Sequence, residues 1–240
     1  MVPLLSLQGI SFAYPDSGKE IFTDLEFSLY EKQRIGLMGP NGCGKTTFLR
    51  LCVGLLRPSR GYVKFKGKLV KSDKDLIRLR RSIGFVFQNP DDQLFSPTVL
   101  EDVAFGPLNL GMDRDRAEEI ARWSLAMVGL DGFEDRIIHK LSGGEKRLLS
   151  IATILAMQPE AMLLDEPSTG LDVRTRRRII ELLNRLDMAL VVVSHDGDFV
   201  LRTTSSYCTI EGGRIIALER DLIHQHVHYH PAGHIPHEHI

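Results

Sequence analysis

The side chains best suited to chemistry lie in one glycine-rich segment, residues 39–47, which reads GPNGCGKTT. It follows the pattern G-x-x-x-x-G-K-[ST], whose backbone N–H groups surround the phosphates of a nucleotide. The Lys45 ammonium would reach the terminal phosphates and the Thr46 hydroxyl would bind Mg²⁺, while the N-terminus of the next helix adds about half a positive charge. A plain glycine-rich turn is the alternative, but every fixed position is filled. We predict a nucleotide site at Gly39, Asn41, Gly42, Cys43, Gly44, Lys45, Thr46 and Thr47.

The sequence around this segment supplies the strand and the helix that it needs. Residues 35–38 are an apolar run typical of a buried strand, and residues 46–55 carry apolar side chains at mostly helical spacing. Further short strands are predicted at residues 4–7, 22–29 and 61–65, so the first part of the chain is expected to be rich in strands.

The rest of the chain is helical first and then alternates between strands and helices. From about residue 88 to 157 the pattern favours helices, one of which is expected to stop at Gly129. Apolar strands at residues 162–164 and 190–193 then flank a helix with apolar residues from Ile179 to Leu186 on one face. This alternation is typical of a parallel sheet built of βαβ units, and it predicts an α/β fold.

The composition excludes several classes of protein. With 240 residues, 43% of them hydrophobic, the chain can bury one large α/β core with or without a smaller lobe. Its net charge of −1 gives no overall attraction to nucleic acid, and its 3 cysteines form no disulfide or metal-binding pattern. No apolar run approaches the roughly 18 residues of a membrane span, and no signal peptide is visible. We expect a soluble chain that serves a membrane, if at all, from its surface.

A second glycine motif, LSGGE at residues 141–145, directly precedes an apolar-faced helix. Ser142 and Glu145 fit the S-x-x-E capping box, so a well-made helix start is sufficient to explain them. Gly143 and Gly144, however, also leave backbone donors bare at the positive end of a helix, which suits a second phosphate.

The order of these motifs resembles that of the ATPase subunit of ATP-binding-cassette (ABC) transporters, and the resemblance reaches to about Leu218. It implies a P-loop NTPase core with a mixed or parallel sheet, an N-terminal antiparallel β subdomain and a helical subdomain inserted at about residues 90–157. The ATPase domain would then be residues 1–220, followed by a tail at 221–240. In this family two ATPase domains dimerise head to tail, and the LSGG segment of one closes on the γ-phosphate held by the other. Glu145 stands where many members have glutamine.

The resemblance also implies the ligands and further site residues. ATP and Mg²⁺ are the expected cofactors, with Thr46, Gln88 and Asp165 around the metal. Glu166 would be the general base for the attacking water, and His195 would hydrogen-bond the γ-phosphate. Catalysis is thus expected from Glu166, His195, Gln88 and Lys45, with Ser142, Gly143 and Gly144 acting on the partner's nucleotide. Taken alone, each of these residues could equally be a loop or strand-end residue.

Three further assignments follow from the same resemblance. Tyr14 is expected to stack on adenine, although an aromatic residue near a strand end is more often part of a core. Asp172 matches a loop that crosses the dimer interface, and it also suits a helix N-cap. The arginines at 174, 176, 177 and 178 are interpreted as a solvated helix face and not as a nucleic-acid patch.

Residues 88–95, QNPDDQLF, and the later VLEDVAFGP are similar to energy-coupling-factor (ECF) importers of vitamins or of nickel and cobalt ions. The expected partners are a second ATPase subunit, identical to this chain or different from it, and two membrane subunits, one for coupling and one for binding substrate. Asp91, Asp92 and Glu101 are expected to receive a basic group of the coupling subunit. The chain would then lie on the cytoplasmic face of the membrane. The alternatives are a non-transport ATPase of DNA repair or translation, and a nucleotide-binding regulator without catalysis.

The C-terminal end is rich in histidine. In an extended strand His224, His226, His228 and His230 would share one face, which suits nickel or cobalt, and this favours a nickel or cobalt importer over a vitamin importer. An inert tail or an expression artefact is the alternative.

A separate hypothesis concerns Cys43: it lies next to a helix N-terminus, where a thiolate is favoured, so alkylation should inhibit the ATPase. Cys52 and Cys208 are predicted to be buried.

Overall fold

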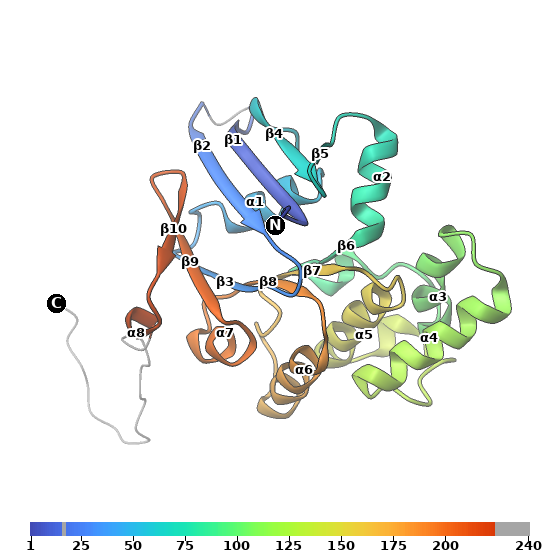
Figure 1. Ribbon diagram of the computed structural model, residues 1–240. Coiled ribbons are helices and arrows are strands. Elements are labelled where there is room, and N and C mark those ends of the chain that lie inside the picture. Colours follow the sequence, from blue (N-terminus) through green and yellow to red (C-terminus); the bar gives the residue numbers. More distant parts are fainter. Residues whose placement is uncertain (16–17, 224–240) are drawn as a thin grey trace, which may run out of the picture.

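The computed structural model describes residues 1–15 and 18–223, and two β-sheets organise them (Figure 1). An antiparallel sheet has the strand order β2-β1-β4-β5. A mixed sheet has the order β10-β9-β3-β8-β7-β6, in which β10 alone runs antiparallel to its neighbour. The strands are β1 (Leu5–Ala13), β2 (Glu20–Leu29), β3 (Arg34–Met38), β4 (Arg60–Phe65), β5 (Lys68–Leu69), β6 (Ile83–Val86), β7 (Ala161–Asp165), β8 (Ala189–Val193), β9 (Ser206–Glu211) and β10 (Arg214–Leu218).

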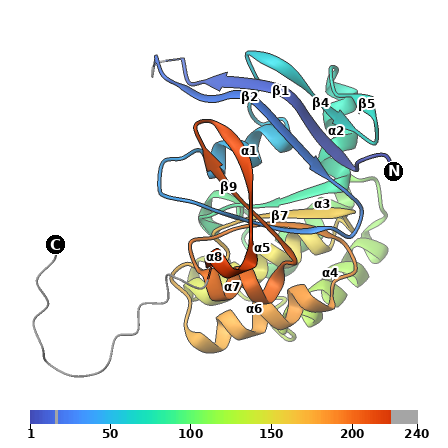
Figure 2. The ribbon, with the colours of Figure 1, turned by 60° about the vertical axis from the view of Figure 1, so that its left-hand side comes forward.

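Helices separate and cover the sheets. Helix α1 lies between the two sheets, and α5, α6 and α7 lie on the opposite side of the mixed sheet (Figures 1 and 2). The helices are α1 (Lys45–Cys52), α2 (Asp73–Ser82), α3 (Val99–Asn109), α4 (Arg114–Val128), α5 (Gly143–Leu155), α6 (Val173–Arg185), α7 (Gly197–Thr203) and α8 (Arg220–Ile223), with 3₁₀ turns at Pro90–Asp92 and Ile138–Lys140.

The central strands are apolar throughout because both faces of the mixed sheet are covered. Successive side chains of a strand point to opposite faces. In β7, Ala161 and Leu163 therefore pack in the core that contains α1, while Met162 and Leu164 pack with the helices of the other face. Continuous apolar runs are what a doubly covered parallel sheet requires, and the predicted βαβ arrangement is confirmed.

The helical segment expected after residue 88 contains α3, α4 and α5, which pack against one another. Helix α4 ends at Gly129, whose φ of 68° lies in the left-handed region, as predicted for a glycine stop. The apolar residues on one face of this helix are buried; they are Ala117, Ile120, Ala121, Leu125 and Val128.

Two boundaries and one helix differ from the sequence prediction. Strand β1 runs to Ala13 and not to residue 7, because an irregularity between Leu7 and Ile10, with Gly9 at a φ of 61°, interrupts the alternation of apolar residues. Helix α1 ends at Cys52, shortly before Gly54, which has a φ of 66°. Helix α2 was missed because it buries only Leu79 and so shows no apolar face, although Ser72 starts it with a capping box.

The fold brings the residues expected around the metal and the attacking water to one edge of the mixed sheet. Strands β3, β6, β7 and β8 are parallel, so their carboxyl ends meet at the same edge. Parallel α/β sheets bind ligands at this edge. No helix within residues 1–15 and 18–223 has the length and apolar character of a membrane span.

Candidate nucleotide-binding site

The loop between β3 and α1 has the shape of an anion cradle. Gly39, Gly42 and Gly44 have φ values of 148°, 81° and 108°, which favour glycine. At Gly44 a side chain is also excluded by space, because a Cβ would lie 2.7 Å from the Ile21 side chain. Gly44 is the N-cap of α1. Because glycine has no side chain, the N-cap offers no acceptor to the first N–H groups of the helix. Such a helix start favours a bound anion.

Lys45 is folded back onto this loop. Its Nζ donates to the carbonyl oxygens of Gly39, at 2.7 Å, and Pro40, at 2.9 Å, and the residue is buried. The ammonium therefore lies over the cradle, where a phosphate of a bound nucleotide would take the place of these carbonyls as its partner.

A cleft of about 480 Å³ opens beside the loop. Most of the predicted site residues within the described part of the chain line it; the exceptions are Gly39, Cys43, Ser142, Gly143, Gly144, Asp172 and His195. The lining is Tyr14, Ile21, Asn41, Gly42, Gly44, Lys45, Thr46, Thr47, Gln88, Asp165 and Glu166. Tyr14 is anchored at the rim by a hydrogen bond of 3.1 Å between its hydroxyl and that of Thr47. Sequence reasoning did not single out Ile21, because an apolar residue in a strand carries no visible chemical signal.

Asp165 is a buried carboxylate without regular hydrogen-bond partners. It is 1% exposed, and neither of its carboxylate oxygens has a hydrogen-bond partner among the described residues. Burial raises the pKa of Asp165, and the nearby Thr46 hydroxyl, Arg50 and Lys45 offset only part of that rise. An orphaned carboxylate beside a threonine hydroxyl and the Gln88 side chain offers the oxygen ligands that Mg²⁺ takes, so these residues fit the metal.

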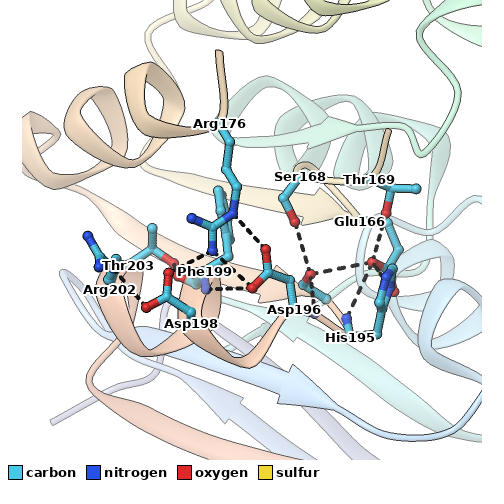
Figure 3. A network of polar contacts seen from close by, with 11 residues as sticks. Glu166, Ser168, Thr169, Arg176, His195, Asp196, Asp198, Phe199, Arg202 and Thr203 are labelled. Carbon is cyan, nitrogen blue, oxygen red and sulfur yellow. Dashed lines mark hydrogen bonds and ion pairs between the residues drawn. The ribbon is translucent and has the colours of Figure 1, made fainter. Parts of the chain in front are cut away.

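Glu166 follows Asp165 in a constrained backbone conformation. Its φ of 47° is in the left-handed region, which costs a non-glycine residue about 1–3 kcal/mol. Its N–H donates to the Val193 carbonyl at 2.8 Å, which holds the turn against the end of β8. The carboxylate oxygen Oε2 lies 2.8 Å from His195 Nδ1 and 3.2 Å from the Thr169 hydroxyl. The two residues expected to act on the attacking water and the γ-phosphate are therefore already in contact (Figure 3).

The LSGG segment lies elsewhere on the chain. Ser142 caps α5, and the predicted capping box with Glu145 is present. Neither Ser142 nor Gly143 nor Gly144 lines the cleft. A Cβ on Gly144 would meet the Thr175 hydroxyl at 3.2 Å, so the segment lies beside the start of α6. If these residues contact a nucleotide, it is one held by another chain.

Asp172 is the N-cap of α6, as predicted, and accepts the N–H groups of Arg174 and Thr175. The interpretation of the following arginines as a solvated face was wrong for Arg176. Its guanidinium bonds Asp196 and Asp198, because α6 packs beside α7. Arg177 and Arg178 are exposed, as expected.

The three free cysteines divide as predicted. Cys52 and Cys208 are buried, and burial raises the pKa of both thiols, that of Cys208 to about 12. Cys43 is partly exposed in the phosphate loop. The histidines His224, His226, His228 and His230 lie outside the described residues.

Comparisons with known proteins identify the family. A model described as ABC transporter matches residues 22–169. A putative ABC transporter ATP-binding protein of Nitratidesulfovibrio vulgaris is 48% identical, covering 99% of this chain and 86% of the relative. The chain belongs to the ABC transporter family. It is similar to ATP-hydrolysing transporter ATPases of this family along most of its length, and the predicted enzyme class is confirmed.

Other relatives of this ABC ATPase are more specific in name. The energy-coupling factor transporter ATP-binding protein EcfA of Methanothermobacter thermautotrophicus is 44% identical, covering 89% of this chain and 70% of its own length. Among solved structures, cbiO1 from Clostridium perfringens, part of the ABC transporter complex cbiONQ, has a TM-score of 0.80 and 32% identity, covering 90% of this chain and 88% of that one.

A second solved structure is a dimer of the ATP-binding cassette MJ0796 in a post-hydrolysis state, bound to ADP and Pi. Its TM-score is 0.80 at 27% identity, covering 90% of this chain and 98% of that one. The α/β fold class, with its antiparallel sheet, mixed sheet and added helices, is confirmed by these likenesses.

Proposed function

We propose that this ABC ATPase powers an ECF-type importer, with nickel or cobalt ions as cargo. The observation that carries the ECF assignment is its 44% identity, over 89% of the chain, with a relative named energy-coupling factor transporter ATP-binding protein. The metal cargo is supported by the histidines at the end of the sequence. A vitamin or another cargo is the second candidate.

In this proposal the cleft residues position ATP and an attacking water. Lys45 would move from the Gly39 and Pro40 carbonyls to the β- and γ-phosphates, and Tyr14 at the rim would stack on adenine. Thr46, Asp165 and Gln88 would hold Mg²⁺, which supplies charge stabilisation for the phosphates. Glu166 would orient the water and accept its proton, while His195, now bonded to Glu166, would turn its imidazole to the γ-phosphate.

The cycle requires a second ATPase subunit. Ser142, Gly143 and Gly144 would close on a nucleotide held by the partner, because they are absent from the cleft of their own chain. The neighbouring Asp172 lies at the start of α6, where the same interface would form. Bound ATP would bridge the two subunits and its hydrolysis would release them. The partner would be a second copy of this chain or a different ATPase subunit.

The membrane coupling subunit would bind on the segment after β6. Of the three carboxylates expected there, Asp91 accepts Lys146 Nζ at 2.6 Å and Glu101 caps α3 together with Thr98, so both already have partners in the chain. Asp92 is exposed and free of ion pairs with the described residues. An exposed aromatic pair follows, Phe95 and Phe105, with ring centroids 4.6 Å apart. We propose that Asp92 and this pair receive a basic, partly apolar helix of the membrane subunit, which would place the chain on the cytoplasmic face of the membrane.

The proposed cycle is tested with the variant Glu166→Gln. Saturated with Mg-ATP, it should bind nucleotide without turnover and form a dimer measurable by light scattering, while the same variant with ADP should stay monomeric. Dimerisation should also be lost when Gly144→Asp is added, since the LSGG segment would no longer fit a phosphate. If Glu166→Gln stays monomeric with Mg-ATP even in the presence of the membrane subunits, the proposed cycle is wrong.

The cargo is tested separately. Vesicles that contain the full complex should take up radioactive nickel or cobalt when Mg-ATP is supplied on the side of the membrane that carries the ATPase. They should not take it up without Mg-ATP on that side. Calorimetry with nickel on the full chain, compared with a chain that stops at residue 223, should show binding that depends on the tail. Equal nickel binding by both chains would remove the tail's role, and uptake of a vitamin instead would favour the second candidate.

A further inference from the structure

Arg176 is held in a geometry unlike that of its neighbours on α6. Its Nε and Nη2 donate to both carboxylate oxygens of Asp196, at 2.7 and 3.0 Å, and Nη2 also donates to Asp198 at 2.8 Å. The side chain is 24% exposed. Arg177, the next residue, is 80% exposed, and its ion pair within the described residues is with Glu181 on its own helix. A two-point contact between a guanidinium and a carboxylate fixes orientation as well as distance.

The partner of Arg176 is the residue directly after His195. Asp196 is held at three points: Arg176 bonds its carboxylate, the carboxylate caps α7 through the Phe199 N–H at 3.0 Å, and its own N–H donates to Ser194 Oγ at 3.1 Å. Burial opposes ionisation, but the contacts with Arg176 and the Phe199 N–H hold the pKa of Asp196 below its usual value. The backbone on the C-terminal side of His195 is therefore fixed.

The same contacts continue to the general base. Ser194 is fully buried, and its hydroxyl lies 3.4 Å from Glu166 Oε2 and 3.3 Å from the Ser168 hydroxyl. Figure 3 shows the resulting series of side chains from Arg176 through Asp196 to His195 and Glu166. Within the described part of the chain, Glu166 is the hydrogen-bond partner of the His195 imidazole, which is otherwise 63% exposed. The direction of this ring therefore depends on the backbone that carries it.

We propose that Arg176 is a positioning residue for catalysis, which sets the orientation of His195 and Glu166 through Asp196. Two observations favour this role over that of a simple link between α6 and α7. Glu166 has a left-handed backbone conformation that persists only when its surroundings hold it. In addition, Arg176 lies one helical turn after the N-cap Asp172, so it connects the start of α6 to the loop that contains His195.

This role predicts a loss of turnover without a loss of binding. The substitution Arg176→Met removes the guanidinium but keeps much of the apolar stem. The matched control Arg177→Met removes a neighbouring, exposed arginine whose ion pair among the described residues is with Glu181. We expect the kcat of Arg176→Met for ATP to fall by about 10- to 100-fold, since a displacement of about 1 Å at a catalytic group can cost 10²-fold. The KM for ATP should be unchanged, because Arg176 is not among the residues that line the cleft.

Two further variants separate positioning from stability. Arg176→Lys keeps one charged contact and should recover part of the lost kcat. Asp196→Asn should lower kcat to a similar extent. The double variant Arg176→Met with Asp196→Asn should have a kcat no lower than that of the less active single variant, because both substitutions break the same contact. The melting temperature of each variant measures its effect on stability, and kcat is calculated per molecule of folded protein. If Arg176→Met folds poorly, Arg176→Lys and Asp196→Asn still test the proposal.

Three results would overturn the proposal: wild-type kcat in Arg176→Met, an equal loss in Arg177→Met, or additive losses in the double variant. The proposal relies on the roles given above to Glu166 and His195. The assay follows ATP turnover by the full chain and is independent of cargo and membrane partner. Loss of turnover in Glu166→Gln with none in Arg176→Met would therefore reject this inference and leave the proposed function standing.

Discussion

Asp165 should destabilise the nucleotide-free protein, and replacing it should make the protein more stable and inactive. The side chain is 1% exposed, and neither carboxylate oxygen has a hydrogen-bond partner among the described residues. A buried polar group without a partner costs about 1–3 kcal/mol, and a charged one more. Attraction from Arg50 and Lys45 offsets part of this cost. Asparagine removes the charge but keeps a polar amide at the same place, so we expect Asp165→Asn to gain about 1 kcal/mol, which raises the melting temperature of a chain of this size by about 2–4 °C.

The gain should depend on pH in a defined direction. Burial raises the pKa of Asp165, so the folded protein keeps this proton better than the unfolded chain does. The stability that belongs to the protonated form is present below the usual aspartate pKa and is lost as pH rises through the raised value. Asp165→Asn should therefore exceed the wild type clearly at pH 8, and the difference should shrink near pH 4.

Thermal unfolding in EDTA, without nucleotide, is the appropriate measurement. The matched control is Asp187→Asn, which changes an exposed aspartate paired with Lys32 and should shift stability by no more than about 0.5 kcal/mol. Adding Mg-ATP should raise the melting temperature of the wild type and of the control, while Asp165→Asn should gain little from Mg²⁺ and should not hydrolyse ATP. If Asp165→Asn melts at or below the wild type in EDTA at pH 8, the view of Asp165 as an uncompensated charge is wrong.

Three further predictions concern other parts of the chain. Alkylation of Cys43 should inhibit ATP hydrolysis and bound ATP should protect, since the thiol lies in the phosphate loop; full activity after stoichiometric labelling, checked by mass spectrometry, would contradict this. Gly36→Ala should cost about 1–3 kcal/mol in urea unfolding, because its Cβ would lie 2.3 Å from Val200 Cγ1, and an unchanged midpoint would show that α7 moves freely. Asp92→Lys should weaken assembly with the membrane subunits in co-purification while basal ATPase persists; intact assembly would exclude Asp92 from the interface.

Local patterns in the sequence were sufficient to predict the phosphate loop and the starts of α5 and α6. The G-x-x-x-x-G-K-T spacing needs only neighbouring residues, and the capping box of Ser142 with Glu145 forms within a single turn. The buried strands β7 and β8 were also visible, because a sheet covered on both faces requires continuous apolar runs. These features could be predicted because the residues that determine them are close together in the chain.

The contacts of Arg176 and Arg147 could not be predicted in this way. Arg176 looked like one of several exposed arginines, and only the packing of α6 beside α7 brings it to Asp196, 20 residues later. Arg147 follows the LSGGE motif on α5 and is buried, and its guanidinium donates to the carbonyls of Phe87 and Gln88 after β6. The helical spacing of the sequence does not decide whether Arg147 lies on the buried or on the exposed face of α5. Long-range packing decides which arginine is a surface charge and which holds a loop.

Three unfavourable features of the protein lie together at the carboxyl edge of the mixed sheet. The first turn of α1 has no side-chain cap, Asp165 is a buried carboxylate whose oxygens lack regular hydrogen-bond partners among the described residues, and Glu166 has a left-handed backbone conformation. Elsewhere the helices α2, α3, α4, α5, α6 and α7 begin with a side-chain cap, so the bare start of α1 is not a general property of this chain. A phosphate would satisfy the helix start and a magnesium ion would satisfy the carboxylate. A single Mg-nucleotide bound there would therefore relieve two of the three costs, which is the physical reason to propose this site and not one of the other clefts.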